Sequence, residues 1–178
     1  MDDSVFLRLY EEYNRDVFNF LIYLTRNRDI AEDLMHEVYV RVLKSYSNFE
    51  GKSSEKTWLF AIAKNVSIDY FRKQATMKKH TDLHFDWETQ ELVADGLLPE
   101  QLIESDEEKR LVLEELHNCT GDQKMVILMR FFQDLTIAET AEVLEWTEGK
   151  VKTTQHRAVK ALKEKVEARS VRKGRSNE

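Results

Sequence analysis

Residues that interrupt helices are unusually scarce in this sequence, and their scarcity constrains the fold more than any other feature. The 178 residues include one proline, Pro99, and five glycines. Proline removes a backbone donor and glycine weakens a helix, so long stretches without either favour continuous helices. Apolar residues recur at helical spacing in these stretches, as at Phe6, Tyr10, Tyr13 and Val17. The sequence therefore predicts an all-α fold.

Charge divides the chain into parts of different character. Residues 1–75 carry a net charge of −1, residues 76–120 carry −8 and residues 121–178 carry +3, which gives −6 for the whole chain. This pattern indicates a near-neutral first module, an acidic connector and a basic-tipped second module. We expect two small helical domains joined by an acidic linker. The expected boundaries are a first domain over 1–75, the linker over 76–98, a second domain over 99–168 and a basic tail over 169–178.

The first domain ends in a predicted helix that combines aromatic and cationic side chains. Asp29 and Glu32 resemble a capping pair for an earlier helix, and the polar segment 47–56 predicts a loop before the helix at 57–74. On that helix, Trp58, Asn65 and Arg72 share one face at heptad spacing, with Lys56, Phe60 and Lys64 beside them. Such a surface can stack on bases and attract phosphates. An ordinary amphipathic helix with solvated lysines is the alternative.

The second domain carries a helix-turn-helix pattern. A first helix is expected from Pro99 to about His117, and Thr120 with Gln123 resembles a capping box for the next one. In the segment 134–163, Thr136 and Glu139 form a further capping box, small Ala141 suits a close helix crossing, and Thr147 can cap the second helix of the motif. Glu145 stands in the turn, where a left-handed backbone costs a non-glycine residue ~1 kcal/mol.

The second helix of this motif has the composition of a DNA-reading helix. It carries the cations Lys150, Lys152, Arg157 and Lys160, and the polar residues Thr153, Gln155 and His156. Lysine and arginine attract phosphates, and the polar side chains can bond base edges in the major groove. A solvated basic helix that closes a bundle is the alternative.

Other sequence features narrow the class of protein. A lone cysteine, Cys119, excludes an internal disulfide framework and fits a reducing cytoplasm. The acidic, amphipathic first residues predict no signal peptide, and no apolar run approaches the ~20 residues of a membrane span. We therefore expect a cytoplasmic location.

Two motifs, in this order and with a short connector between them, carry a resemblance to a known family. The stretch "AEDLMHEVYVRVLKSYSNFEGKSSEKTWLFAIAKNVSIDYFRKQ" resembles the promoter-melting domain of a sigma-70 factor, and "TIAETAEVLEWTEGKVKTTQHRAVKAL" resembles its upstream-element domain. The resemblance covers roughly residues 5–165 and is to the extracytoplasmic-function (ECF) group, most of all to the sigma X type of Bacillus-like bacteria.

The resemblance implies a function and a set of partners. It implies an alternative sigma factor that binds core RNA polymerase and directs promoter-specific transcription initiation. The factor would read the minus-thirty-five element and melt the minus-ten element. It implies no enzymatic activity and no cofactor. The implied partners are core RNA polymerase, promoter DNA as a duplex and as a melted non-template strand, and an anti-sigma factor, which is often membrane-anchored.

The resemblance also implies roles for individual residues. The residues that match the polymerase-binding face are Asp33, Leu34 and Glu37. Those that match the capture of the melted minus-ten strand are Phe49, Gly51, Lys52, Ser53, Ser54, Lys56 and Asn65. Those that match minus-thirty-five contacts are Arg130, Thr136, Lys150, Lys152, Thr153, His156 and Arg157. The sequence departs from the family pattern at His36, Glu50, Thr120 and Glu145. The departures in the loop bear on the preferred base and not on the family.

Two other functions are compatible with parts of the sequence. A carboxylate-bridged di-metal bundle would use the i, i+3 pairs Asp33–His36 and Glu114–His117, although further inward carboxylates are not identifiable. A helix-turn-helix regulator with a helical sensory domain would bind specific DNA without polymerase. The surface expected on the 57–74 helix argues against that second alternative, because a sensory domain has no need of it.

Overall fold

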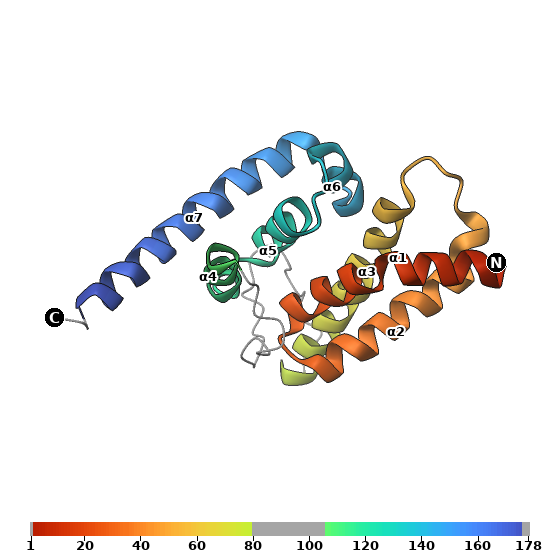
Figure 1. The fold of residues 1–178 in the computed structure, drawn as a ribbon, viewed down its shortest axis with the longest axis horizontal. Coiled ribbons are helices and arrows are strands. Elements are labelled where there is room, and N and C mark those ends of the chain that lie inside the picture. The colour runs from red at the N-terminus through yellow and green to blue at the C-terminus, as the bar shows by residue number, and fades with distance from the viewer. Residues whose placement is uncertain (1, 80–105, 176–178) are drawn as a thin grey trace.

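In the computed structural model, residues 2–79 and 106–175 are described, and every regular element in these two ranges is a helix. The all-α prediction is confirmed. The helices form two modules that lie against each other, with the C-terminal end of the last helix projecting away from the rest (Figure 1). Most of the predicted linker, including His80 and His84, lies outside the described residues.

The first module consists of α1 (Asp3–Thr25), α2 (Arg28–Ser45), the short 3-10 helix η1 (Tyr46–Asn48) and α3 (Glu55–Lys79). These helices enclose a core of fully buried apolar side chains. The core includes Val17, Phe20, Leu21, Ala31, Val38, Leu59, Phe60 and Ala63. The last of the helices, α3, continues four residues beyond the boundary expected at residue 75.

The turn between α1 and α2 is set by two adjacent residues. Arg26 ends α1 with a left-handed backbone (φ 52°), and Asn27 caps α2 by accepting a hydrogen bond from the Ile30 amide at 3.1 Å. The prediction that Asp29 and Glu32 cap this helix is wrong, because Asn27 supplies the cap two residues earlier. The Glu32 carboxylate instead accepts a bond from Arg28 at 3.0 Å.

The second module consists of α4 (Glu107–Leu116), α5 (Gly121–Ile127), the π-helix η3 (Leu128–Phe132), α6 (Ile137–Leu144) and α7 (Glu148–Arg175). Both capping boxes are confirmed: the Thr120 and Thr136 side chains cap α5 and α6, and Gln123 and Glu139 bond back to them. The prediction of one helix from Pro99 to His117 is wrong, because Asp106 has an extended backbone and caps the start of α4.

The helix-turn-helix is formed by α6 and α7 as the sequence predicts. Thr147 accepts a hydrogen bond from the Lys150 amide at 3.1 Å, and Val151 is fully buried against the rest of the module. Glu145 ends α6 with φ 58°, the left-handed backbone expected at this turn. The segment expected as a basic tail is helical as far as Arg175, because α7 continues through it.

Candidate functional site

Two carboxylates on α2 stand exposed at the surface of the first module. Of the three residues matched to polymerase binding, Asp33 and Glu37 are exposed, whereas Leu34 is 6 % exposed and belongs to the core. The Glu37 carboxylate accepts a hydrogen bond from Arg41 at 2.6 Å, and Arg41 also reaches Asp69 at 3.1 Å. Leu34 thus holds the helix in place, and the two acidic side chains are available to a partner.

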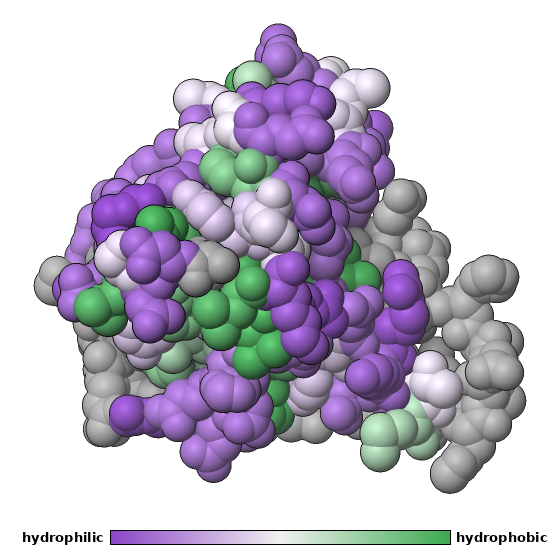
Figure 2. Space-filling view, turned by 90° about the vertical axis from the view of Figure 1, so that its right-hand side faces the viewer, coloured by the Kyte–Doolittle hydropathy of each residue, from purple (hydrophilic) through white to green (hydrophobic). Residues whose placement is uncertain are grey.

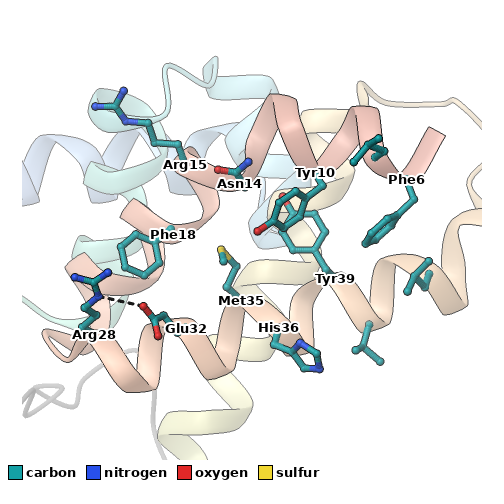
Figure 3. A pocket seen from close by; sticks show the side chains of 13 residues that line it. Phe6, Tyr10, Asn14, Arg15, Phe18, Arg28, Glu32, Met35, His36 and Tyr39 are labelled. Carbon is teal, nitrogen blue, oxygen red and sulfur yellow. Dashed lines mark hydrogen bonds and ion pairs between the residues drawn. The ribbon is translucent and has the colours of Figure 1, made fainter. Parts of the chain in front are cut away.

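An apolar groove of about 790 Å³ lies between α1 and α2 on the same side as His36 (Figure 3). Its floor includes the packed rings of Phe6, Tyr10 and Tyr39, with Tyr10 and Tyr39 centroids 4.9 Å apart. Its edges include Leu7 and Leu43, which are 55 % and 50 % exposed. The groove therefore presents large apolar side chains beside a charged helix face.

The sequence contains a partial indication of this groove. Leu7 and Leu43 fall outside the buried stripes of their helices, as does Val40, which lines the groove as well. Helical spacing alone cannot show that apolar residues on two different helices meet. Figure 2, which views the end of the molecule where the chain begins, shows apolar residues gathered in one area with hydrophilic residues around them.

The loop between η1 and α3, residues 49–54 (the capture loop), lies beside a cluster of three packed aromatic rings. The Phe49 centroid lies 5.8 Å from Tyr46 and 5.1 Å from Trp58, and those two rings are 5.7 Å apart. Gly51 has φ 70°, a backbone that side chains rarely adopt. Lys52 is exposed and lies beside the Glu50 carboxylate, whereas Ser54 accepts a bond from the Thr57 amide at 3.1 Å and so begins α3.

A bidentate ion pair anchors the end of the capture loop to α1. The Arg8 guanidinium donates to both oxygens of Glu55 at 2.9 and 2.8 Å, and the Tyr46 hydroxyl donates to the same carboxylate at 3.2 Å. The bonds from Arg8 lower the pKa of Glu55, although partial burial opposes this. No local pattern links residues 47 positions apart, so the role of Arg8 could not be found from the sequence.

The expected aromatic and cationic surface of α3 is only partly exposed. Asn65 is exposed, but Phe60 is fully buried and Lys64 is 5 % exposed. The prediction that Phe60 and Lys64 share an open surface is therefore wrong. Burial lowers the pKa of Lys64, and the Glu145 carboxylate 3.8 Å away opposes that shift. Lys56 donates to the backbone carbonyl of Gln133 at 2.8 Å.

One face of α7 presents four of the residues expected to read DNA. Lys152, Thr153, His156 and Arg157 are exposed, and the opposite face packs inward through Val151, Ala158 and Leu162. These four side chains lie within about one and a half helical turns. We call this exposed part of α7 the recognition face.

The other three residues matched to this element have partners inside the module. Arg130 donates from Nε to the Gln155 side-chain oxygen at 2.9 Å and also bonds the Leu135 carbonyl. Thr136 caps α6. The Lys150 ammonium lies 4.0 Å from the Trp146 ring centroid and 3.7 Å from the Asp122 carboxylate. These contacts lie inside the module and hold α7 in the orientation that exposes the recognition face.

The part of the chain that the structure describes offers no cluster of three or more His, Cys, Asp or Glu side chains that could hold a metal ion. In particular, Glu114 pairs with Arg169 at 2.6 Å, and the His117 ring lies against the Glu114 backbone carbonyl. A helix long and apolar enough to cross a membrane is likewise not found among the described residues.

The two modules coincide with two known protein families. Residues 9–76 match the model of sigma-70 region 2, and residues 112–162 match that of sigma-70 region 4. This chain belongs to the sigma-70 family. It is 47 % identical over 165 residues to the ECF RNA polymerase sigma factor SigX of Bacillus subtilis, an alignment that covers 93 % of this chain and 85 % of that protein.

A second relative agrees with the assignment, and two solved structures share the fold. The B. subtilis RNA polymerase sigma factor YlaC is 31 % identical over 87 % of this sigma factor and 88 % of its own length. The fold is similar to the sigma factor RpoE in its complex with the anti-sigma factor NepR from Bartonella quintana. That likeness has a TM-score of 0.69 at 22 % identity and covers 88 % of this chain and 95 % of the other. CnrH, solved with the cytosolic domain of CnrY, gives a TM-score of 0.68 at 16 % identity, covering 94 % and 90 %.

Family membership confirms the function that the resemblance implies. The protein is an alternative sigma factor of the ECF group, which works with RNA polymerase and directs promoter-specific transcription initiation. Initiation factors of this kind are not enzymes.

Proposed function

We propose that this sigma factor docks on core RNA polymerase through Asp33, Glu37 and the adjacent groove between α1 and α2. The observation that carries the proposal is the combination of two exposed carboxylates and an apolar groove with exposed Leu7 and Leu43 at its edges. Exposed apolar patches rimmed by charge mark protein interfaces. A clamp surface that is basic and partly apolar would complement both features.

The capture loop and the start of α3 are proposed to hold the melted minus-ten strand. The rings of Tyr46, Phe49 and Trp58 offer stacking surfaces, and exposed Lys52 and Asn65 offer polar contacts. Base stacking on an aromatic side chain contributes ~1–3 kcal/mol per base. Gly51 and Ser53 would let the strand approach the loop closely, Ser54 sets where α3 begins, and Lys56 would add a cation beside the strand.

The recognition face is proposed to read the minus-thirty-five element in the major groove. Lys152 and Arg157 can bond guanine edges or phosphates, and Thr153 and His156 can bond other base edges. Because Arg130, Thr136 and Lys150 bond within the module, their proposed part is to position α7, with Lys150 adding positive charge near the phosphates.

An anti-sigma factor is the proposed regulator. Two structures have the same fold: RpoE was solved with the anti-sigma factor NepR, and CnrH was solved with the cytosolic domain of CnrY. We propose the same class of partner here, often membrane-anchored in this group, acting on a sigma factor located in the cytoplasm.

The test is reconstitution with purified core RNA polymerase. The protein is expected to co-elute with the core enzyme on gel filtration and to start transcripts at discrete sites on genomic fragments that core enzyme alone leaves silent. A stand-alone regulator would instead protect specific DNA without polymerase and would not co-elute with it. That second result would overturn the proposed contacts.

A further inference from the structure

Three segments of the first module meet at one of its ends, and Glu55 is the residue that joins them. Figure 1 shows the start of α1, the end of α2 and the start of α3 at this end. The Glu55 carboxylate accepts two bonds from Arg8 of α1, and one of its oxygens also accepts the bond from the Tyr46 hydroxyl. Because Tyr46 lies before the capture loop and Glu55 directly after it, these bonds tie both ends of the loop to α1.

The pair between Arg8 and Glu55 fixes an orientation as well as a distance. The neighbouring residue Leu9 is fully buried, so α1 is held by the core at this point. The two bonds, 2.9 and 2.8 Å long, run side by side from the guanidinium to the two carboxylate oxygens, and such a pair restricts the angle between the groups. Partly exposed ion pairs contribute only modestly to stability. The main consequence of this pair is therefore geometric.

Tyr46 links this ion pair to the aromatic cluster beside the capture loop. Its hydroxyl bonds Glu55, while its ring centroid lies 5.8 Å from that of Phe49 and 5.7 Å from that of Trp58. Burial and the bond to Glu55 raise the pKa of the Tyr46 phenol, so the hydroxyl keeps its proton and donates at neutral pH. All three rings are half-buried, so each keeps an open part. A shift of Tyr46 would therefore change the ring surfaces that are offered to a base.

We propose that Arg8 is a positioning residue for strand capture, which acts through Glu55 and Tyr46 to set the orientation of the capture loop and its aromatic cluster. This inference rests on the proposed minus-ten site. Arg8 need not contact DNA, because its guanidinium is engaged by Glu55 and, at 3.5 Å, by Glu12. Without the ion pair, the loop is ordered only when the strand arrives, and ordering a loop during binding reduces affinity. Promoter opening then becomes slower, whereas binding to the duplex promoter is unchanged.

Graded substitutions test this role, and one residue of α1 supplies a matched control. Arg8→Gln removes the ion pair, and Arg8→Lys keeps the charge but cannot form two parallel bonds. Tyr46→Phe removes the hydroxyl and keeps the ring. The control is Glu12→Gln, which neutralises the other carboxylate that Arg8 reaches. Because Glu12 belongs to α1 itself, its bond with Arg8 does not tie α1 to the loop.

The measurement is the rate of promoter opening by holoenzyme, at a promoter found by the reconstitution above. Permanganate reactivity of unpaired thymines, followed in time, gives both the rate and the final extent of opening. We expect Arg8→Gln to open the promoter about 3–10-fold more slowly than Glu12→Gln, because a loop without its ion pair must be ordered during capture. Arg8→Lys and Tyr46→Phe should fall between them. Binding to core polymerase and the upstream footprint should match the parent protein. A variant that was merely less stable would reduce the extent of opening and not its rate.

A double-mutant cycle separates positioning from a direct bond between Arg8 and a phosphate. If Arg8 acts through Glu55, then Arg8→Gln/Glu55→Gln should slow opening no more than either single change, because residues that share one interaction are not additive. If Arg8 bound a phosphate itself, Glu55→Gln would leave the rate unchanged or raise it, since the guanidinium would be released to the DNA. That second result would overturn the proposal.

Phe49→Ala in the same assay distinguishes failure of this inference from failure of the proposed minus-ten site. Slow opening by Phe49→Ala together with a parental rate in Arg8→Gln would reject the positioning role and keep the site. Parental rates in both variants would reject the site and the role with it. Equal slowing by Glu12→Gln and Arg8→Gln would show a general effect of charge on α1, and that result would also reject the role.

Discussion

Glu145 adopts a backbone conformation that glycine holds at no steric cost. Its φ of 58° closes the turn between α6 and α7, where the sequence already indicated a strained position. A side chain in this conformation costs on the order of 1 kcal/mol. An acidic residue stands at a position where glycine would be less strained, and its carboxylate lies 3.8 Å from the Lys64 ammonium. Glu145 therefore combines a strained backbone with an ion pair to the first module.

Comparing glycine with alanine at this position isolates the backbone cost. Glu145→Gly and Glu145→Ala both remove the carboxylate, so the contact with Lys64 is absent from both. We expect Glu145→Gly to exceed Glu145→Ala in free energy of unfolding by ~1 kcal/mol, because alanine keeps the left-handed strain. Urea denaturation followed by circular dichroism measures the difference. Equal stabilities would show that the turn relaxes when its side chain changes.

Glu55 gives a stability contribution that depends on pH. Arg8 lowers the pKa of Glu55 below its ordinary value of 4.5 in the folded chain. A carboxyl with a lowered folded-state pKa stabilises the protein above its unfolded pKa, and this contribution is lost as pH falls through the folded-state value. We expect Glu55→Gln to lower the urea midpoint at pH 7, and the difference from the parent to shrink below pH 4.5. A difference that persists unchanged in acid would contradict the role of the ionised pair.

At the scale of the helix, α7 combines a buried stripe with the recognition face. Val151, Ala158 and Leu162 fix its orientation, so substitutions on the exposed side should leave the fold intact. We expect Lys152→Ala/Arg157→Ala to weaken transcription from promoters that depend on the minus-thirty-five element by ~1–3 kcal/mol for each side chain that bonds a base edge. Binding to polymerase should be retained. Promoter activity in reconstituted transcription is the measurement.

A control on the same helix removes the same charge from a different place. Lys173→Ala/Arg175→Ala lies in the last turn of α7, where both side chains are exposed and far along the helix from the recognition face. It should leave promoter selection nearly unchanged. If both double variants reduced transcription equally, the recognition face would contribute only general charge and not base reading.

Local elements could be predicted from the sequence because their causes are local. The capping boxes at Thr120 and Thr136 and the left-handed turn at Glu145 each depend on residues a few positions apart. The capping role of Asn27 was not predicted, because Asp29 and Glu32 offered an equally plausible cap for α2. The burial of Lys64, the groove beside Tyr10 and Tyr39, and the anchoring of Glu55 by Arg8 depend on helices that meet in space, which periodicity cannot reveal.

For the molecule as a whole, the distribution of charge fits a polymerase subunit. A protein that binds DNA alone is usually basic, because phosphate neutralisation supplies much of its affinity. This sigma factor has a net charge of −6 and gathers ten Lys and Arg residues from Lys150 onward against three acids. Acidic surfaces elsewhere disfavour free DNA binding. Assembly with polymerase can then position the DNA-reading side chains on the promoter, which the subunit does not do on its own.

The acidic face of α2 is where this dependence on polymerase can be tested most directly. Asp33 and Glu37 are exposed one helical turn apart, and Glu37 shares Arg41 with Asp69. Asp33→Lys/Glu37→Lys should therefore cost the fold no more than ~1 kcal/mol, since exposed ion pairs contribute little. Against a basic clamp surface the same change brings like charges together, which costs several kcal/mol. We expect the variant to keep its helical spectrum and nearly its melting temperature but to lose binding to core polymerase on gel filtration.

The control for this last variant is Glu142→Lys/Glu164→Lys, which makes the same charge change at exposed positions of the second module. It should co-elute with polymerase as the parent does, because neither residue lies near the groove between α1 and α2. Loss of binding in both variants would show that net charge matters and not this face. Wild-type binding by Asp33→Lys/Glu37→Lys would remove α2 from the interface, and the groove lined by Leu7 and Leu43 would then need another partner.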